Sequence, residues 1–215
     1  MKKIPTSLVL VFILLVAGCT TPAQEEVWNP HGDPLTNVKA SDFTLLTSEN
    51  ESWTYSEQAA NTTLVVAFLF TNCLDVCPVV THNMRWVQSQ LTPEESQKTT
   101  FLTITVDPWR DNASVLQNWK ANADANWTHL TIPDTTSGGA WMNALESVWL
   151  NFGVGLLIEE TNSSSTARHH PSDYTVNHTT GTIIVDRFGV LRVWWGDNDW
   201  ILDLFLEDLR YLNTL

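Results

Sequence analysis

Residues 64–70, with the sequence Leu-Val-Val-Ala-Phe-Leu-Phe, form an uninterrupted apolar run rich in β-branched and aromatic residues. Such a run is typical of a strand that is covered on both faces, as in an α/β sheet. Cys73 and Cys77 follow this run, and Pro78 comes directly after the second cysteine. Because proline at the first helical position loses no hydrogen bond, Pro78 predicts the start of a helix. The order of strand, cysteines and helix therefore indicates an α/β fold with both thiols at a helix N-terminus.

This position gives the two thiols a chemical role. The unpaired N–H groups and the positive end of the helix dipole favour the thiolate over the thiol. The thiolate is both the nucleophile and the metal ligand of cysteine chemistry. We therefore interpret Cys73 and Cys77 as reactive or metal-binding residues, and a structural disulfide between them is the alternative.

The third cysteine belongs to a different feature. Lys2 and Lys3 precede an apolar stretch, residues 8–16, which Ala17 and Gly18 separate from Cys19. The stretch is too short to span a bilayer as a helix, and this pattern is typical of a cleaved signal peptide. Residues 1–18 are therefore predicted to be a lipoprotein signal, with Cys19 as the lipidated residue. An uncleaved anchor, the alternative, would leave the domain on the same extracytoplasmic face of the cell membrane, where disulfides persist.

The formal net charge of −13 restricts the possible partners. An acidic protein is a poor match for nucleic acid or for an anionic lipid surface. The charge is compatible with a basic partner, with a metal cation or simply with solubility. Membrane association is accordingly expected through the lipid anchor.

The chain is expected to form one domain behind a tether. Residues 19–40 contain several prolines among polar residues, have no hydrophobic period and are predicted to be a flexible tether. Residues 41–215 contain the periodic apolar segments and form the predicted domain. No internal repeat and no second domain is apparent.

Apolar periodicity predicts the remaining elements. A hairpin is expected from residues 43–46 and 53–55, a helix from Pro78 to Leu91 that Thr92-Pro93 ends, and a strand at 101–106. Further expected elements are a helix with Val115, Leu116 and Trp119 capped by Asp111 or Asn112, a helix at 141–152, a strand at 182–185, a turn at 186–189, a strand through Trp195 and a last helix with Ile201, Leu204, Phe205 and Leu209.

Three separated segments carry a resemblance to a known family. Residues 70–78 contain a C-x-x-x-C-P pattern with Asp75 between the cysteines, residues 105–111 read Thr-Val-Asp-Pro-Trp-Arg-Asp, and residues 173–179 read Asp-Tyr-Thr-Val-Asn-His-Thr. In this order they resemble the Sco/SenC family of thioredoxin-like, copper-binding assembly proteins for cytochrome c oxidase. The resemblance covers roughly residue 42 to the C-terminus. It implies a thioredoxin-like α/β fold, with a central mixed sheet flanked by helices and an N-terminal β-hairpin.

The resemblance also implies a copper site formed by Cys73, Cys77 and His178. Cu(I) prefers soft thiolates together with imidazole, which is the set that these residues supply. The cysteine spacing is one residue longer than the usual C-x-x-C of thioredoxin-like oxidoreductases, and His178 occupies the facing loop where those proteins usually have a proline. Both differences favour binding of copper, as Cu(I), Cu(II) or both. A redox-active Cys73–Cys77 disulfide remains compatible with this interpretation.

Other residues near these segments have two interpretations each. His169 and His170 are either auxiliary copper contacts or surface histidines. Asp75 either tunes the thiolates or interacts with a cation of a partner, or it is an exposed turn carboxylate. Asp107 and Arg110 are expected to fix the loop between a strand and a helix. His82 and His129 are expected to be structural or exposed, and Trp109 and the Trp194-Trp195 pair to be core residues or a docking surface.

Two departures from the family pattern affect the site. Asn177 stands where the family usually has an aspartate before the histidine, which removes a negative charge beside the metal. An altered copper affinity or release is the expected consequence. Leu74 replaces a frequent proline and should only loosen the turn.

The resemblance implies a lipid-anchored copper chaperone that delivers copper to the binuclear copper site of a respiratory terminal oxidase subunit. Other copper chaperones and thiol reductants are further possible partners. The alternative is a thiol–disulfide oxidoreductase that reduces the copper-ligand cysteines of that subunit, with Cys73 attacking and Cys77 resolving. A peroxiredoxin-like peroxidase is a weaker third interpretation, because the residues around Cys73 do not match such a pocket.

Overall fold

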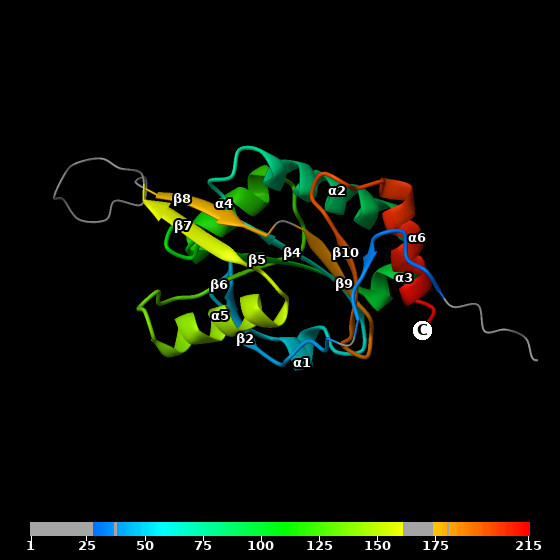
Figure 1. The fold of residues 1–215 in the computed structure, drawn as a ribbon, viewed down its shortest axis with the longest axis horizontal. Helices are drawn as coiled ribbons and strands as arrows, with labels where there is room; N and C mark the ends of the chain where they lie inside the picture. The colour runs from blue at the N-terminus through cyan, green and yellow to red at the C-terminus, as the bar shows by residue number, and fades with distance from the viewer. Residues whose placement is uncertain (1–27, 37, 161–173, 180) are drawn as a thin grey trace, which may run out of the picture.

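The computed structural model describes residues 28–36, 38–160, 174–179 and 181–215. An eight-stranded mixed sheet has the order β1-β10-β9-β4-β5-β6-β2-β3 (Figure 1). Its strands are β1 (Asp33–Pro34), β2 (Thr44–Thr47), β3 (Ser52–Thr54), β4 (Thr63–Leu69), β5 (Thr99–Thr105), β6 (Thr128–Thr131), β9 (Thr182–Val185) and β10 (Leu191–Trp195). The pairs β4–β5 and β5–β6 are parallel, and the other pairs are antiparallel. The predicted central mixed sheet is therefore confirmed.

Helices cover both faces of this sheet. They are α1 (Tyr55–Gln58), α2 (Val76–Gln90), α3 (Pro93–Lys98), α4 (Ala113–Asn122), α5 (Ala140–Asn151) and α6 (Leu202–Leu212). Buried residues of α5 belong to one hydrophobic cluster, and buried residues of α2 and α6 belong to the other. Figure 1 shows α5 on the side of the sheet opposite to α2.

The central strand β4 has all seven residues buried, as the apolar run predicted. Successive side chains of a strand point to opposite faces. Val66 and Phe68 accordingly lie in the cluster with α5, whereas Val65 and Ala67 lie in the cluster with α2 and α6. Burial of each of the larger side chains among these, valine and phenylalanine, stabilises the fold by about 1.5–3 kcal/mol. The strand therefore holds the cysteine-bearing loop after Leu69 on a rigid support.

Local signals place several other elements correctly. The expected hairpin is β2–β3, in which Leu45 lies opposite Trp53. Asn112 caps α4, because its side chain accepts a hydrogen bond from the N–H of Val115. The helix α3 was not anticipated. Thr92-Pro93 ends the preceding helix as expected, but Thr92 also opens α3 through a capping box with Glu95.

A separate two-stranded ribbon was also missed by the sequence analysis. It consists of β7 (Leu156–Glu160) and β8 (Tyr174–His178), and Leu156 lies opposite His178. His178 therefore ends a strand, which corrects its expected position in a loop. The two strands are far apart in the sequence, so no short turn motif between them predicted their pairing.

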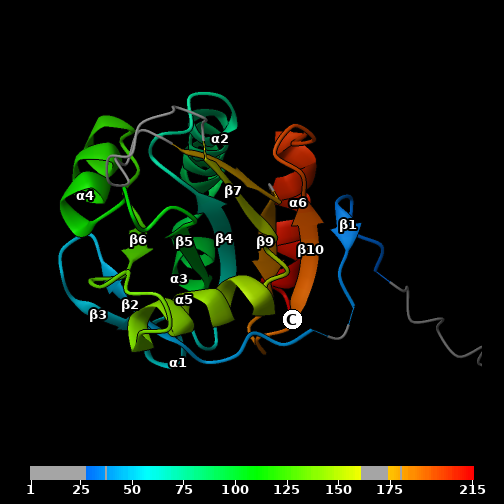
Figure 2. The same cartoon turned by 60° about the vertical axis from the view of Figure 1, so that its left-hand side comes forward.

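The N-terminal segment departs from the expected tether. β1 forms one edge of the sheet and pairs with β10, beside which it lies in Figure 2. The N–H groups of His31 and Gly32 donate to the buried carboxylate of Asp208, and Trp28 stacks on Tyr211 with ring centroids 4.5 Å apart. The described part of the segment is thus packed on the domain well before residue 40. Cys19 lies outside the described residues, and no helix within them is long and apolar enough to cross a membrane.

Candidate metal centre

Cys73 lies in the loop after β4, and Cys77 lies in the first turn of α2. The helix begins at Val76, two residues earlier than the predicted start at Pro78. Cys77 is fully buried, Cys73 is half-buried, and the two are not joined by a disulfide. The predicted placement of both thiols at a helix N-terminus is confirmed.

Hydrogen bonds make the two thiols chemically unequal. The S–H of Cys77 donates to the sulfur of Cys73 and, with backbone N–H groups of residues 75–77, lowers the pKa of Cys73 to about 5 despite its partial burial. The same hydrogen bond, together with burial, raises the pKa of Cys77. At neutral pH the pair is therefore one thiolate and one thiol.

The residues between the cysteines face solvent. The side chain of Leu74 is 92% exposed, and Asp75 is exposed at the N-cap position of α2 without a side-chain capping bond. This placement is that of an exposed turn carboxylate. It leaves Asp75 accessible to a partner, the other interpretation made from the sequence.

His178 lies at the end of β8 with its ring packed edge-on against Phe70 at a centroid distance of 5.7 Å. Its Nδ1 is 2.9 Å from the carbonyl oxygen of Thr179. A carbonyl can only accept, so Nδ1 carries the proton and Nε2 keeps the lone pair that a metal requires. Burial lowers the pKa of His178, which favours the neutral ring. His178 thus has the protonation state of a metal ligand.

Phe70 connects the histidine to the cysteine pair. Its N–H bonds to the sulfur of Cys77, and its carbonyl oxygen accepts the N–H of Cys73 at 3.3 Å. Its ring contacts His178. In the described residues, however, no three His, Cys, Asp or Glu side chains are gathered closely enough to hold a metal ion. The structure thus joins the two cysteines directly and the histidine through Phe70, without a preformed three-ligand cluster.

Two other groups of residues considered in the sequence, the remaining histidines and the tryptophans, have the following positions. His129 is buried, its Nδ1 contacts the carbonyl oxygen of Trp127 at 3.0 Å, and burial lowers its pKa to about 4. Trp195 is a core residue, whereas Trp109 is 38% exposed. His169 and His170 lie outside the described residues.

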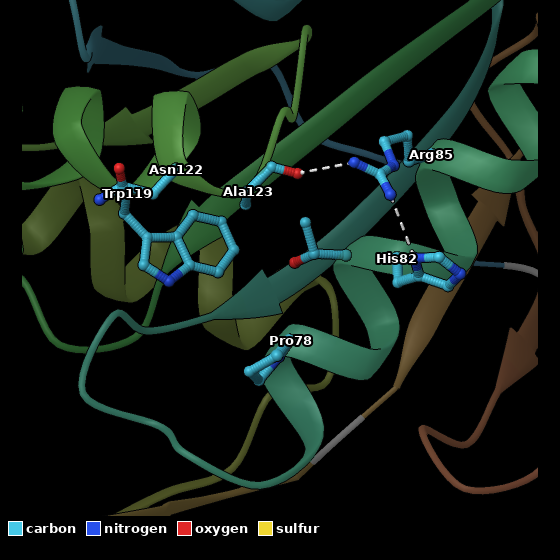
Figure 3. A pocket seen from close by; sticks show the side chains of 7 residues that line it. Pro78, His82, Arg85, Trp119, Asn122 and Ala123 are labelled. Carbon is cyan, nitrogen blue, oxygen red and sulfur yellow. Dashed lines mark hydrogen bonds between the residues drawn. The ribbon is translucent and has the colours of Figure 1, made fainter.

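A groove of about 400 Å³ lies between α2 and α4, next to the cysteine turn (Figure 3). Pro78, His82 and Arg85 come from α2, and Trp119 faces them from α4. Arg85 is 3.3 Å from Nδ1 of His82, which must accept because a guanidinium only donates. Neither cysteine lines this groove, and His82 is a surface residue as expected.

The loop between β5 and α4 contacts both the segment before the cysteines and the strand that carries His178. Asp107 and Arg110 form an ion pair at 2.9 Å, and both contact Tyr174 at the start of β8. Asp111 accepts the N–H and hydroxyl of Thr71, and burial raises its pKa to about 6. The expected loop-fixing role of Asp107 and Arg110 is thus extended to Tyr174. Asp107, Arg110 and Tyr174 all lie in the sequence motifs, but nothing in the sequence predicted that they contact one another.

Comparisons with known proteins identify the family. A family model described as SCO1/SenC matches residues 32–199, so the chain belongs to the SCO1/SenC family. The SCO1 protein homolog of Bacillus subtilis (strain 168) is 29% identical over 211 residues, which span 96% of this chain and 94% of that protein.

Solved structures share the fold. The solution structure of apo Sco1 protein from Thermus thermophilus is similar with a TM-score of 0.68 and 23% identity, covering 87% of this chain and 99% of that one. The structure of Bradyrhizobium japonicum ScoI with copper bound has a TM-score of 0.63 and 19% identity, covering 82% of this chain and 99% of that one. The predicted thioredoxin-like α/β fold is confirmed.

Proposed function

We propose that this protein is a copper chaperone and that Cys73, Cys77 and His178 together bind the copper ion that it carries. The observation that carries the proposal is the hydrogen-bonded thiolate–thiol pair, with a neutral histidine held next to it through Phe70. Membership in a family that includes a copper-bound structure supports copper as the cargo.

The donor set suits copper chemically. Two soft sulfurs and one imidazole nitrogen match the preference of Cu(I). Cys73 is already a thiolate, and Cys77 would release its proton when copper binds. Because no three-ligand cluster is preformed in the described residues, Nε2 of His178 would move toward the sulfurs to complete the site.

The recipient in this proposal is the copper-site subunit of a respiratory terminal oxidase. Its cysteines would displace the thiolates of this protein one at a time, so that each step exchanges one soft ligand for another. Lipidation of Cys19 would keep the domain on the extracytoplasmic face of the membrane, next to an integral membrane partner. The motif before Cys19 supports this anchor.

Copper titration of the reduced protein tests the proposal. We expect one copper per chain for the wild type, and a lost or loosened copper in Cys73→Ser, Cys77→Ser and His178→Ala. All samples carry Cys19→Ser, so that this third thiol does not contribute while Cys73 and Cys77 stay free. A wild type that binds no copper tightly would contradict the proposal.

A thiol–disulfide reductase is the second candidate, favoured by the low pKa of Cys73 and the protonated resolving thiol of Cys77. The two candidates differ in their need for the histidine. If His178→Ala binds copper as well as the wild type while the dithiol reduces a peptide disulfide, the reductase replaces the chaperone.

A further inference from the structure

Within the part of the chain that the structure describes, the ribbon that carries His178 has no strand pairing with the main sheet. β7 and β8 pair with each other, apart from the eight-stranded sheet. A two-stranded hairpin is marginally stable by itself, so its position has to be set by side-chain contacts. Val176 supplies one of these through burial in the core cluster with α5. The contacts at the start of β8 are polar and more directional.

Tyr174, at the start of β8, is bound at three points by the loop between β5 and α4. Its hydroxyl donates to Asp107 at 2.5 Å, and its carbonyl oxygen accepts from Arg110 at 2.5 Å. The guanidinium of Arg110 lies 3.6 Å from the centroid of the Tyr174 ring and also bonds Asp107 at 2.9 Å. Asp107 is fully buried, so the hydroxyl of Tyr174 contacts a carboxylate shielded from water.

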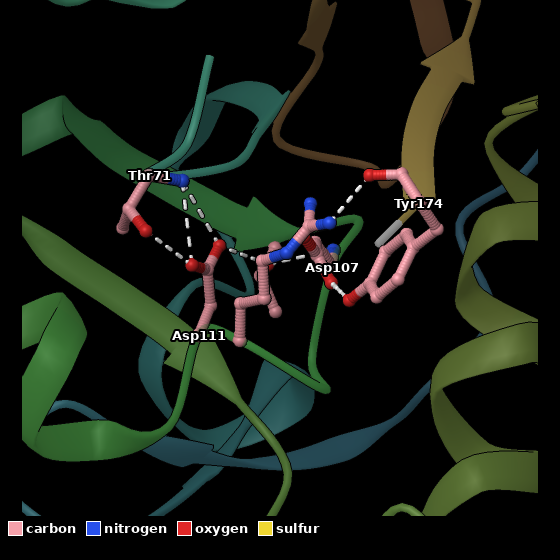
Figure 4. Close-up of polar contacts among 6 residues, drawn as sticks. Thr71, Asp107, Asp111 and Tyr174 are labelled. Atoms are coloured by element: carbon pink, nitrogen blue, oxygen red, sulfur yellow. Dashed lines mark hydrogen bonds and ion pairs between the residues drawn. The ribbon is translucent and has the colours of Figure 1, made fainter. Parts of the chain in front are cut away.

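The same loop also holds the cysteine segment. Asp111 accepts the N–H of Thr71 at 3.1 Å and the hydroxyl of Thr105 at 2.7 Å, in addition to the hydroxyl of Thr71. Thr71 lies two residues before Cys73. Figure 4 shows Asp111 with Thr71 on one side of the loop and Asp107 with Tyr174 on the other.

We infer that Asp107, Arg110 and Tyr174 are positioning residues that set the distance between His178 and the cysteine pair. Loop 107–111 contacts the two halves of the centre at once, through Thr71 on the cysteine side and Tyr174 on the histidine side. This inference rests on the proposed copper-binding function. The hydroxyl of Tyr174 makes the one of these three contacts that a substitution can remove while it leaves the other two in place.

The substitution Tyr174→Phe removes this hydroxyl and keeps the ring over Arg110. Because the ligands themselves are unchanged, the copper affinity should fall about tenfold, as for a lost outer hydrogen bond at a metal site. The fall should depend on His178. In a His178→Ala background the same substitution should change the copper affinity less than about twofold, since the residue that it positions is gone.

The control is Tyr211→Phe, which removes the same atom from a tyrosine near the C-terminal end of α6 that stacks on Trp28. We expect the wild-type copper affinity for this control and an unchanged circular dichroism spectrum for all variants. The inference is overturned if Tyr174→Phe binds copper like the wild type, or if its defect persists in full without His178.

A measurement without copper separates this inference from the proposed function. In the apo protein, nuclear Overhauser contacts between the rings of Phe70 and His178 report the position of the ribbon. We expect these contacts to weaken in Tyr174→Phe and to remain in Tyr211→Phe. Unchanged contacts in Tyr174→Phe would overturn the inference whether or not the protein binds copper, whereas a wild type without copper binding would overturn only the proposed function.

Discussion

Cys73 and Cys77 differ in chemistry although they are only four residues apart. The first is a partly exposed thiolate, and the second is a buried thiol that stabilises it by a hydrogen bond. This inequality suits a metal site that exchanges ligands, because the exposed sulfur can meet a partner first. It also gives a direct test by pH.

Alkylation of Cys73 by iodoacetamide should reach its half-maximal rate near pH 5. The thiolate reacts, and its fraction rises as the pH increases through the pKa of Cys73, which is about 5 and not the usual value near 8.5. Mass spectrometry of the Cys73 peptide measures this rate separately from Cys19.

The matched variants are Cys77→Ala and Cys77→Ser. Alanine removes the donor, and a rise of the Cys73 pKa by about 2 units would lower the thiolate fraction at pH 6 roughly tenfold. Serine keeps an O–H donor and should retain most of the low-pH reactivity. A Cys73 that reacts only above about pH 8 in the wild type would contradict the hydrogen-bonded pair.

The sequence could predict the position of these thiols but not their surroundings. An apolar strand followed by a helix start is a local signal, so Cys73 and Cys77 were placed correctly. The contact between Tyr174 and Asp107 joins residues 67 positions apart, and the ring of His178 contacts Phe70 across an even larger separation in the sequence. No periodicity or spacing encodes such pairs, because they depend on how the finished elements pack.

Among the elements, the N-terminal segment is unusual because it adds the short strand β1 to the sheet edge. Asp208 of α6 accepts the N–H groups of His31 and Gly32 and the indole N–H of Trp195. Such contacts are not expected of a flexible tether. They could not be predicted because residues 28–36 are mostly polar and show no hydrophobic period. One buried carboxylate therefore fastens strand, helix and N-terminal segment together.

Asp208→Ala should release this segment. The substitution leaves three N–H donors without their acceptor and should lower the free energy of unfolding by about 2–4 kcal/mol. Chemical denaturation measures the loss, and proteolysis in the first described residues should become faster. Asp203→Ala, on the exposed part of the same helix, should change the free energy of unfolding by less than about 1 kcal/mol. Equal effects of the two substitutions would contradict the role of Asp208.

In the molecule as a whole, one set of elements provides the stable frame and another set completes the candidate centre. The buried strand β4 and the helices on both faces of the sheet provide the stable frame, which the apolar pattern of the sequence largely predicted. The ribbon β7–β8 and loop 107–111 complete the candidate centre. They are joined to the frame by polar contacts and by the buried side chain of Val176. These parts were the least predictable, since polar side chains have several possible partners and only the tertiary structure selects among them.

The central claim is that copper is bound by Cys73, Cys77 and His178 together. X-ray absorption spectroscopy of the reduced, copper-loaded protein tests it most directly, because sulfur and imidazole nitrogen neighbours of copper are distinguished by distance and scattering. The account predicts two sulfur ligands and one imidazole, with the imidazole signal lost in His178→Ala. A wild-type spectrum without an imidazole, or one that His178→Ala leaves unchanged, would contradict it.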